Sequence, residues 1–365
     1  MQITDIPVEG YERVVEAKDP GSGLHAIVSI HDTTLGPALG GLRMWPYPTA
    51  ADALFDVNRL SRGMTFKSAV AHTGLGGGKA VIIGDPATVK SEALYLAMGR
   101  FIESLGGRYI TAEDVNTDIA DLEIVRRTTS YVTGLPRAVG GSGNPSPYTA
   151  YGVFLGLQAA VERRLGKATL DGVTVAVQGV GAVGSALVRR LAQAGAKVTI
   201  ADRSASRVEA LVKELKVASV PEAEIMTVAC DVFAPCALGA ILNDDSVPKL
   251  RCTVVAGAAN NALLAAKHGQ MLRDRKILYA PDYVINAGGI INVGCEFLPG
   301  GYDEQESLKR IERIPAALRE LWTIAEREGI PTSEAADHLA QRIVAEGKAR
   351  NAARLSLAPQ QPHRR

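Results

Sequence analysis

The sequence predicts an α/β protein built from two domains. Its 365 residues are enough for two domains of ordinary size, and 47% of them are hydrophobic, which supplies two buried cores. Strand and helix patterns alternate on both sides of a turn-rich segment, residues 140–147. We therefore expect one domain over residues 1–145, a second over 146–330, and a C-terminal helix and tail over 331–365.

The first domain shows strands and helices in alternation. Residues 24–30 follow the pattern of a strand, and apolar residues at helical spacing predict helices over 50–64 and 89–105. Short apolar runs at 80–83 and 108–111 predict further strands. This order predicts a mixed sheet covered by helices.

A second alternating series follows the turn-rich segment. It comprises a helix over 149–163, then strand, helix, strand and helix over 173–178, 182–194, 198–201 and 204–215, and later apolar runs at 232–234, 254–256 and 277–279. This rhythm is typical of a doubly wound parallel sheet. Beyond it the chain is helical, with a break expected at Pro315, a last helix opening at Pro331, and a frayed terminus.

The composition argues against several function classes. The net charge is +1, so no basic field is present to attract nucleic acid. No N-terminal signal and no apolar run long enough to cross a bilayer are visible, so we expect a cytoplasmic protein that does not bind membranes. The six histidines lack the spacing of metal ligands, so no metal site is expected.

The cysteines are interpreted as buried free thiols. They are Cys230, Cys236, Cys252 and Cys295, which form no Cys-x-x-Cys pair and lie in apolar surroundings. Cys236 follows Pro235 at an expected strand end, where a nucleophile would fit, but no histidine lies near it in the sequence. A structural role is therefore favoured.

A glycine-rich turn in the second domain predicts a dinucleotide site. An expected strand leads into Gly179-Val180-Gly181-Ala182-Val183-Gly184, and an amphipathic helix follows. Gly179 permits the tight turn, Gly181 lets the backbone approach a pyrophosphate, and Gly184 lets the helix pack on the strand. The helix N-terminus favours phosphates, so these residues are candidate cofactor contacts of a Rossmann-type domain. A plain glycine turn is the alternative for the loop alone.

Asp202 indicates which dinucleotide binds. It ends the next expected strand, at the position that accepts a ribose 2′-hydroxyl. Its carboxylate would repel a 2′-phosphate, so NAD is favoured over NADP. The adjacent Arg203 weakens this preference, because an arginine can accommodate that phosphate.

Two lysines of the first domain, Lys67 and Lys79, lie in a glycine-containing stretch. Lys67 ends the run Gly-Met-Thr-Phe-Lys, and Lys79 follows three glycines. Ammonium groups that are brought together disfavour each other's protonation, so one becomes a candidate general base. A solvated loop lysine is the alternative for either residue alone. With a nucleotide site, the pair indicates amine or carbonyl redox chemistry.

Seven segments carry a further set of motifs: residues 39–44 (LGGLRM), 63–67 (GMTFK), 76–79 (GGGK), 111–115 (TAEDV), 233–239 (FAPCALG), 256–261 (AGAANN) and 280–289 (APDYVINAGG). In this order, over nearly the whole chain, they resemble the amino acid dehydrogenases. That family includes the glutamate, leucine, valine and phenylalanine enzymes, and the likeness is greatest to the leucine enzymes.

The resemblance implies roles for residues of the first domain, which would be the substrate domain. Lys67 would hold the α-carboxylate, and Lys79 would be the general base that activates water. Asp114 would relay protons of the amino group and steady the lysine charges. Gly40 and Gly41 would place bare backbone against the substrate. Burial and the nearby Lys67 would lower the pKa of Lys79, as a base requires.

The resemblance also implies contacts in the second domain. Asn286 would hydrogen-bond the amino group, and Thr149 would contact the nicotinamide carboxamide. Asn260 and Asn261 compete for one cofactor contact, and the sequence does not choose between them. The other implied cofactor contacts are Cys236, Ala237, Ala258 and Asn286.

Apolar residues line the implied side-chain pocket: Leu39, Met64, Ala112, Ile290 and Val293. A glutamate enzyme needs a cation where Leu39 stands, and an unpaired buried carboxylate would cost several kcal/mol. Leucine, isoleucine and valine are therefore favoured. Phenylalanine stays the alternative, because Asn116 replaces an expected glycine and Gly294-Cys295 replaces a more polar pair beside the pocket.

The implied reaction is the reversible, NAD-dependent oxidative deamination of an apolar L-amino acid to its 2-oxo acid and ammonia. Closure of a cleft between two domains would exclude water from the hydride step. The resemblance further implies a homo-oligomer, from dimer to octamer, and a C-terminal helix that returns to the substrate domain. A catalytically inactive NAD-binding protein is the alternative of another class, but such a chain would be free to lose Lys79 or Asp114.

Overall fold

The structure, a computed structural model, describes residues 1–237 and 239–357, and its contacts divide the chain into two compact units. The first unit holds residues 1–133 together with the chain from residue 338 onward, and the second holds residues 134–337. The domain limits expected from the sequence lie after residues 145 and 330, whereas the two units meet after residues 133 and 337. The expected frayed terminus lies outside the described residues.

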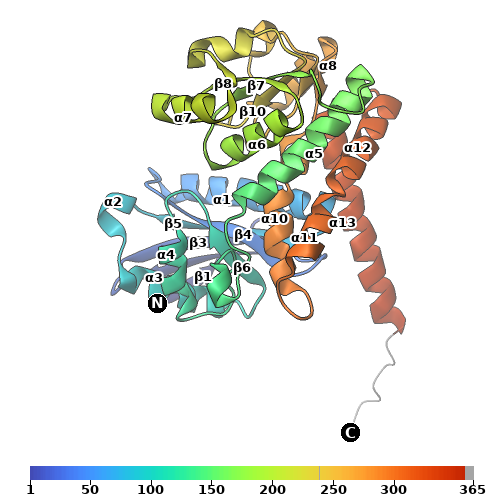
Figure 1. The fold of residues 1–365 in the computed structure, drawn as a ribbon. Coiled ribbons are helices and arrows are strands. Elements are labelled where there is room, and N and C mark those ends of the chain that lie inside the picture. The colour runs from blue at the N-terminus through green and yellow to red at the C-terminus, as the bar shows by residue number, and fades with distance from the viewer. Residues whose placement is uncertain (238, 358–365) are drawn as a thin grey trace. The chain divides into compact units, whose positions relative to one another are not determined.

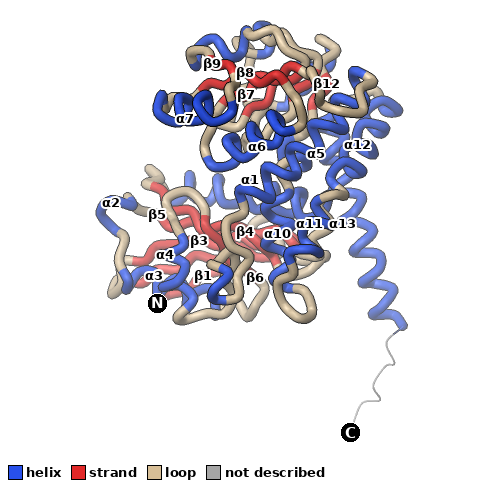
Figure 2. Tube along the Cα trace, in the orientation of Figure 1, coloured by secondary structure: helices blue, strands red, loops and turns tan. Residues whose placement is uncertain are grey.

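A mixed sheet forms the centre of the first unit (Figures 1 and 2). Its strands are β1 (Gln2–Asp5), β2 (Arg13–Asp19), β3 (Leu24–Asp32), β4 (Ala38–Trp45), β5 (Gly76–Ile83) and β6 (Tyr109–Glu113). They lie in the order β1-β2-β3-β5-β4-β6. The pairs β1–β2, β2–β3 and β3–β5 are antiparallel, whereas β4 runs parallel to its neighbours β5 and β6. The predicted mixed sheet is confirmed.

Helices cover this sheet. They are α1 (Ala50–Val70), α2 (Pro86–Val89), α3 (Glu92–Glu103), α4 (Ile119–Arg126) and the later part of α13 (Thr332–Leu357). α1 packs on one face, where Ala53 and Val57 meet Ile27 of β3 and Val81 of β5. α3 and α4 pack on each other and contact β3 and β6 (Figure 1).

The last helix joins the first unit through polar contacts. Lys348 of α13 forms an ion pair with Asp32 at the end of β3, with 3.0 Å between Nζ and Oδ2. The Asn351 side chain donates a hydrogen bond to the carbonyl oxygen of Thr34 at 3.0 Å. Residues from both ends of the chain therefore build one unit.

Several elements of the first unit differ from the sequence prediction. α1 continues to Val70 because packing of Thr65 against Gly77 overrides the weak helix propensity of Gly63 and Thr65. The helix predicted over 89–105 is α3, which begins three residues later than expected because Ser91 caps it. β4 escapes prediction because two adjacent glycines interrupt its apolar pattern.

A parallel sheet forms the centre of the second unit (Figure 2). Its strands are β7 (Thr174–Gln178), β8 (Lys197–Ala201), β9 (Ala218–Ser219), β10 (Val232–Pro235), β11 (Val254–Val255) and β12 (Leu278–Tyr279). They lie in the order β12-β11-β10-β7-β8-β9, and all their pairs are parallel. This is the order of a Rossmann-type doubly wound sheet, so the predicted fold is confirmed.

The helices of the second unit follow the predicted rhythm. They are α5 (Ser146–Leu165), α6 (Ala182–Gln193), α7 (Ala205–Leu215), α8 (Ala266–Asp274), α9 (Asp282–Ile285), α10 (Gly288–Gly294), α11 (Glu304–Ile311) and α12 (Ile314–Glu328), with short 3₁₀ helices at Arg137–Val139, Glu222–Thr227, Val247–Lys249 and Cys295–Phe297. Pro315 lies in the first turn of α12, so the predicted break is confirmed. Among the described residues, no helix combines the length and apolar character that a bilayer crossing needs.

Gly77 provides a test of the packing between α1 and β5. A Cβ atom at Gly77 would lie 2.0 Å from the backbone nitrogen of Thr65, whereas a Cβ atom at Gly63 on α1 would meet no atom within 4 Å. Gly77→Ala is expected to lower the free energy of unfolding by about 1–3 kcal/mol through overpacking. Gly63→Ala is expected to raise it by up to about 1 kcal/mol through helix propensity. Urea denaturation followed by circular dichroism checks both, and an unchanged midpoint for Gly77→Ala would contradict this packing.

Candidate active site

A buried lysine and a carboxylate meet in the first unit. Lys79 projects from β5 and is 4% exposed. Its Nζ lies 2.8 Å from Oδ1 of Asp114, which directly follows β6. The second carboxylate oxygen, Oδ2, accepts a hydrogen bond from Nε of Arg43 on β4 at 2.9 Å. The parallel strands β4, β5 and β6 thus hold two cations on one carboxylate, and the predicted residues Lys79 and Asp114 lie together.

Gly41 leaves the space that this pair occupies. A Cβ atom at Gly41 would lie 2.7 Å from Cβ of Asp114 and 3.1 Å from Nζ of Lys79. A side chain there would displace the pair. The need for glycine at position 40 has a different cause. A Cβ atom there would lie 1.8 Å from the carbonyl oxygen of Gly78 on the neighbouring strand. Close strand packing alone therefore requires glycine at position 40.

The turn after β6 fixes Asp114. Its backbone N–H donates to Oγ1 of Thr117 at 3.1 Å, and that hydroxyl donates to the carbonyl oxygen of Leu42 on β4. Asn116 has a φ of 61°, in the left-handed region, and its Nδ2 donates to the carbonyl oxygen of Met44 at 3.0 Å. Glycine and asparagine adopt this region most readily. Backbone conformation therefore explains why Asn116 replaces the expected glycine, without any reference to the substrate.

Arg43 joins this carboxylate to a second one. Its Nη1 donates to Oδ2 of Asp56 on α1 at 2.9 Å, and the Tyr47 hydroxyl donates to the same oxygen at 2.7 Å. Arg59 pairs with the other oxygen of Asp56 at 3.2 Å. The guanidinium of Arg43 thus lies between Asp56 and Asp114. Only the glycines and the first leucine of the LGGLRM motif are interpreted from the sequence, so this arginine is missed.

Burial and neighbouring charges set the protonation of the pair. Burial lowers the pKa of Lys79 below its ordinary value; Asp114 opposes this shift, and Arg43 adds to it. Burial alone would raise the pKa of Asp114, but Lys79 and Arg43 together hold that pKa below its usual value. The expectation that burial lowers this pKa agrees with burial as the largest cause, and the expected contribution of Lys67 stays a prediction. Lys79 loses its proton more readily than an exposed lysine does.

The face of the sheet that carries Lys79 is the face covered by α1. Val81, two residues beyond Lys79, packs on α1, and alternate residues of a strand point to the same side. Ala112 lies opposite Gly41 in the β4–β6 ladder, and Leu39 lies two residues before Gly41 on β4. Leu39 and Ala112, two of the predicted pocket residues of this unit, therefore share the face of Lys79.

Met64 and Lys67 lie on α1 rather than in a glycine-rich loop, and both are half-buried. Lys67 follows Asp56 by eleven residues, which is about three turns of helix, so both project from the same side of α1. Asp56 contacts Arg43 of β4 on that side. Lys67 therefore faces β4, beside which the buried pair lies.

The glycine loop of the second unit has the geometry that a phosphate site needs. Gly179 has a φ of 94°, and a Cβ atom there would lie 2.8 Å from Cβ of Ala237. A Cβ atom at Gly184 would lie 2.0 Å from the carbonyl oxygen of Gly179. At Gly181 a Cβ atom would meet no atom within 4 Å, and no side chain caps the N-terminus of α6 there. Packing requires two of the glycines, and the third leaves the helix N–H groups open.

Asp202 lies directly beside this loop. Its Oδ2 accepts a hydrogen bond from the backbone N–H of Val180 at 2.7 Å, and its Oδ1 accepts one from the N–H of Ser204 at 2.8 Å. Arg203 instead pairs with Glu222, with 3.2 Å between Nε and Oε1. The predicted acid therefore belongs to the loop, while the predicted arginine belongs to a surface ion pair.

A hollow of about 290 Å³ opens between α6 and α7. It is lined from α6 by Ala182 and Ser185 and from α7 by Arg207 and Leu211. Arg207 is a cation that a phosphate group bound beside Gly181 would meet. Its position is missed from the sequence, because an arginine on an amphipathic helix normally indicates only a solvated face.

Cys236 and Ala237 follow β10 and lie against Gly179. Burial raises the pKa of the Cys236 thiol to about 12, so almost no thiolate exists near neutral pH and a nucleophilic role gains no support. All four cysteines are free, as expected; Cys295 is fully buried, and Cys230, Cys236 and Cys252 are partly buried. Cys295 contacts Ser307 of α11, so its side chain serves packing between helices.

Asn286 links the remaining predicted cofactor residues. Its Nδ2 donates to Oδ1 of Asn260 at 2.7 Å and to the carbonyl oxygen of Ala258 at 3.1 Å. Asn261 has a φ of 49°, and its carbonyl oxygen accepts from Ala240 N at 2.8 Å. Of the two candidate asparagines, Asn260 is therefore the one tied to Asn286.

The other predicted residues of the second unit gather at α10. Ile290 and Val293 lie on this helix and are 8% and 7% exposed. Thr149 stands in the first turn of α5, and a Cβ atom at Gly289 would lie 2.6 Å from its Oγ1. Close packing of α5 on α10 thus brings Thr149 beside these apolar side chains.

Known proteins match this chain over almost its whole length. Residues 11–131 match the Glu/Leu/Phe/Val dehydrogenase dimerisation domain, and residues 140–208 and 200–351 match Glutamate/Leucine/Phenylalanine/Valine dehydrogenase. Leucine dehydrogenase of Thermoactinomyces intermedius is 51% identical, over 92% of this chain and 91% of that protein. Phenylalanine dehydrogenase of Bacillus thermotolerans is 44% identical, over 93% of this chain and 90% of that protein. The crystal structure of L-tryptophan dehydrogenase from Nostoc punctiforme matches with a TM-score of 0.83 and 43% identity, over 93% of this chain and 97% of that one.

These likenesses, together with the Rossmann-type sheet and the buried Lys79–Asp114 ion pair, define the class of the protein as a two-unit α/β dehydrogenase. The chain belongs to the glutamate/leucine/phenylalanine/valine dehydrogenase family and is an amino acid dehydrogenase. The resemblance stated from the sequence motifs is confirmed.

Arg43→Gln tests the charge arrangement around Lys79. Arg43 lowers the pKa of Lys79, so its loss is expected to raise that pKa. The unprotonated amine then appears at higher pH, and the acidic limb of the pH profile of kcat/KM for amino acid oxidation moves to higher pH. Arg59→Gln is the matched control, because Arg59 touches Asp56 but not Asp114. Equal shifts in both variants would contradict a direct effect of Arg43.

Proposed function

We propose that this enzyme catalyses the reversible oxidative deamination of leucine, isoleucine or valine to the 2-oxo acid and ammonia, with NAD as the oxidant. The likeness to leucine dehydrogenases supports this substrate class. The chemistry rests on one observation, the buried Lys79 with its Nζ 2.8 Å from the Asp114 carboxylate. Deamination needs a base that is uncharged when it acts, and burial supplies it.

Lys67 is proposed to bind the substrate carboxylate. It is half-buried on the side of α1 that faces β4, and a cation at that place attracts the α-carboxylate. Leu39 and Ala112 supply apolar surface on the same face of the sheet as Lys79. A glutamate side chain placed against them would bury an unpaired carboxylate, which costs several kcal/mol. An aliphatic side chain suits this surface.

Lys79 is proposed to act as the general base. The lowered pKa lets Nζ accept a proton from the water that adds to the imine carbon of the substrate. In the reverse direction, the Lys79 ammonium returns that proton as water leaves. A bound NAD would supply the acceptor for the hydride of the α-carbon, and the imine carbon formed in this way is the one to which water adds.

Asp114 is proposed to act mainly as a fixed negative charge. Its lowered pKa keeps the carboxylate ionised near neutral pH, so it seldom holds a proton of its own. Oδ1 orients Nζ of Lys79 through their 2.8 Å contact, while Arg43 anchors Oδ2 at 2.9 Å. Asp114 thus stabilises the Lys79 ammonium whenever the base has taken up a proton.

The second unit supplies the proposed cofactor site, and its residues fit NAD. The open backbone at Gly181 and the uncapped N-terminus of α6 suit a pyrophosphate. The Asp202 carboxylate, held beside the loop, suits a ribose hydroxyl and disfavours a 2′-phosphate. Asn260 and Thr149 are proposed for the nicotinamide side, since Asn260 is linked to Asn286 and Thr149 packs beside α10.

We also propose that the enzyme works as a homo-oligomer. The family description of residues 11–131 as a dimerisation domain supports this. β1 is an edge strand whose four residues are all exposed, so its unpaired backbone groups can meet a second copy. The cytoplasmic location stays a prediction from the sequence.

A phenylalanine-type specificity is the second candidate. The 43–44% identity to a phenylalanine and a tryptophan dehydrogenase favours it. The two sequence departures that suggested it have structural causes instead, because Asn116 serves a left-handed turn and Cys295 packs against α11. The aliphatic assignment is therefore retained.

Lys79→Ala tests the proposed base. The variant is expected to lose about 10²- to 10⁴-fold in kcat, the usual contribution of a general base. Asp114 keeps Arg43 as its partner, so the fold and the binding of NADH, measured by fluorescence titration, should persist. Lys90→Ala is the matched control, because it removes another ion-paired lysine of the first unit. Activity at the wild-type level in Lys79→Ala would remove this residue from the mechanism and would reopen an inactive NAD-binding role.

A substrate panel tests the specificity. Initial rates of NADH formation with leucine, isoleucine, valine, phenylalanine and glutamate give kcat/KM for each, and parallel runs with NADP test the cofactor choice. The aliphatic substrates are expected to differ among themselves by about 10- to 200-fold at most, as one methylene allows. Glutamate should be almost inactive. An equal or higher kcat/KM for phenylalanine would overturn the aliphatic assignment, and equal rates with NADP would overturn the role of Asp202.

A further inference from the structure

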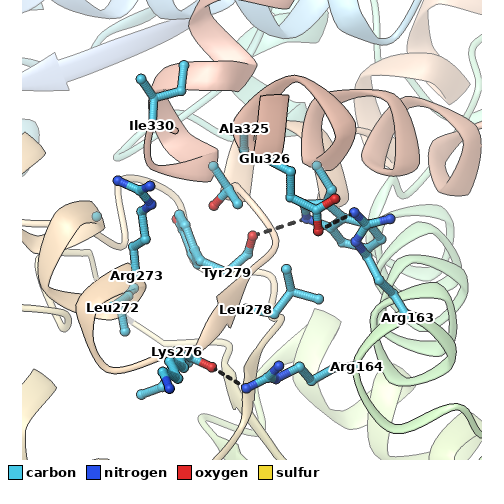
Figure 3. Close-up of a pocket in the computed structure, with 14 residues that line it drawn as sticks. Arg163, Arg164, Leu272, Arg273, Lys276, Leu278, Tyr279, Ala325, Glu326 and Ile330 are labelled. Atoms are coloured by element: carbon cyan, nitrogen blue, oxygen red, sulfur yellow. Dashed lines mark hydrogen bonds and ion pairs between the residues drawn. The ribbon is translucent and has the colours of Figure 1, made fainter. Parts of the chain in front are cut away.

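A second hollow in the second unit has no part in the dehydrogenase reaction. It holds about 440 Å³ and lies at β12, the edge strand of the parallel sheet, among the C-terminal ends of α5, α8 and α12 (Figure 3). Its floor is apolar and aromatic, with Leu272, Ile277, Tyr279 and Trp322 exposed by 0%, 6%, 4% and 1%. Neither the Lys79–Asp114 ion pair nor the glycine loop at Gly179 contributes to this hollow.

Cations surround this floor. Arg163 and Arg164 come from the last turn of α5, and Arg273 and Lys276 come from the end of α8 and the turn after it. Figure 3 shows Arg163 and Arg273 on opposite sides of the hollow, with Arg164 beside Lys276. The one carboxylate of the lining, Glu326, pairs with Arg163 at 2.6 Å. Within the described residues, the other three cations have no acidic partner.

Helix ends explain only part of this arrangement. Basic residues in the last turn of a helix stabilise its free carbonyl groups, and Arg164 donates to the carbonyl oxygen of Lys276 at 2.8 Å. That effect does not require cations from two helices to converge around an aromatic floor. Nε1 of Trp322 is already satisfied by the carbonyl oxygen of Tyr279 at 3.3 Å, and the Arg163 guanidinium lies over the Trp322 ring, 5.6 Å from its centre. The open apolar surface of the hollow therefore comes from Leu278 and Ile330, which are only partly buried.

We propose that this hollow binds an organic phosphate monoester, with its apolar body against Leu278 and Ile330 above the Tyr279–Trp322 floor and its phosphate held by Arg164, Arg273 and Lys276. Guanidinium groups bind phosphate oxygens in a bidentate manner, and three cations suit a dianion better than a single carboxylate. The partly buried aliphatic side chains of Leu278 and Ile330 supply apolar contact for the body of the ligand. The site stands apart from the proposed substrate and cofactor sites, so it holds whether or not those assignments are correct.

Trp322 provides the readout. The chain contains two tryptophans, so Trp45→Phe leaves Trp322 as the single fluorescent indole. In this background, benzyl phosphate is titrated beside inorganic phosphate and benzyl alcohol, with isothermal titration calorimetry on the same samples. Benzyl phosphate is expected to change the Trp322 emission in a saturable manner. Each of the two fragments should bind at least about tenfold more weakly, because each makes only one half of the contacts.

A pair of double variants assigns the site. Arg273→Gln with Lys276→Asn removes two unpaired cations, and asparagine suits the left-handed φ of 56° at position 276. Lys197→Gln with Lys213→Gln is the matched control, because it removes the same charge elsewhere in the second unit. Benzyl phosphate affinity is expected to fall by about tenfold or more in the first variant, as the loss of charge-assisted hydrogen bonds implies, and to stay unchanged in the control.

Arg164→Gln serves as a separate variant of the site and should weaken binding likewise, even where the double variant folds poorly by circular dichroism. Three outcomes would overturn the proposal. They are equal affinity in wild type and the site variants, an equal loss in the charge-matched control, and displacement of benzyl phosphate by NADH, which would place the ligand in the cofactor site.

Discussion

The buried ion pair of Lys79 and Asp114 is the interaction on which the proposed active site depends. Removal of one partner of a buried pair typically costs about 3–5 kcal/mol, because the other charge stays buried alone. Arg43 and Asp56 limit this cost by extending the pair into an alternating chain of charges between β5, β6, β4 and α1. Each charge has a fixed neighbour, so Nζ of Lys79 is held in one place.

The same burial that stabilises the arrangement gives Lys79 its chemistry. A lysine in water is almost fully protonated at neutral pH, whereas burial disfavours the charged form. Asp114 opposes that shift, so the balance between desolvation and one carboxylate decides how easily the proton leaves. Gly41 belongs to this balance, since any side chain there would separate the two groups.

Local sequence patterns predict the glycine loop of the second unit well, but they predict the lysine site of the first unit only in part. The loop of Gly179, Gly181 and Gly184 is predictable because strand, turn and helix are neighbours in sequence, and each glycine has a separate steric reason. Arg43 contacts Asp114 across a separation of 71 residues, which no local pattern reveals. Lys67 and Lys79 are found from their motifs, but the helical setting of Lys67 depends on packing of α1 against β5.

The two units differ in when they can form during synthesis. The second unit is one continuous stretch, residues 134–337, but the first waits for α13, whose Lys348 pairs with Asp32, itself 5% exposed. Domains generally fold as the ribosome releases them, N-terminal segments first. Here the nascent N-terminal sheet stays without its last helix until α13 has been made. Synthesis of α13, rather than emergence of the strand that carries Lys79, is therefore the event that completes the first unit.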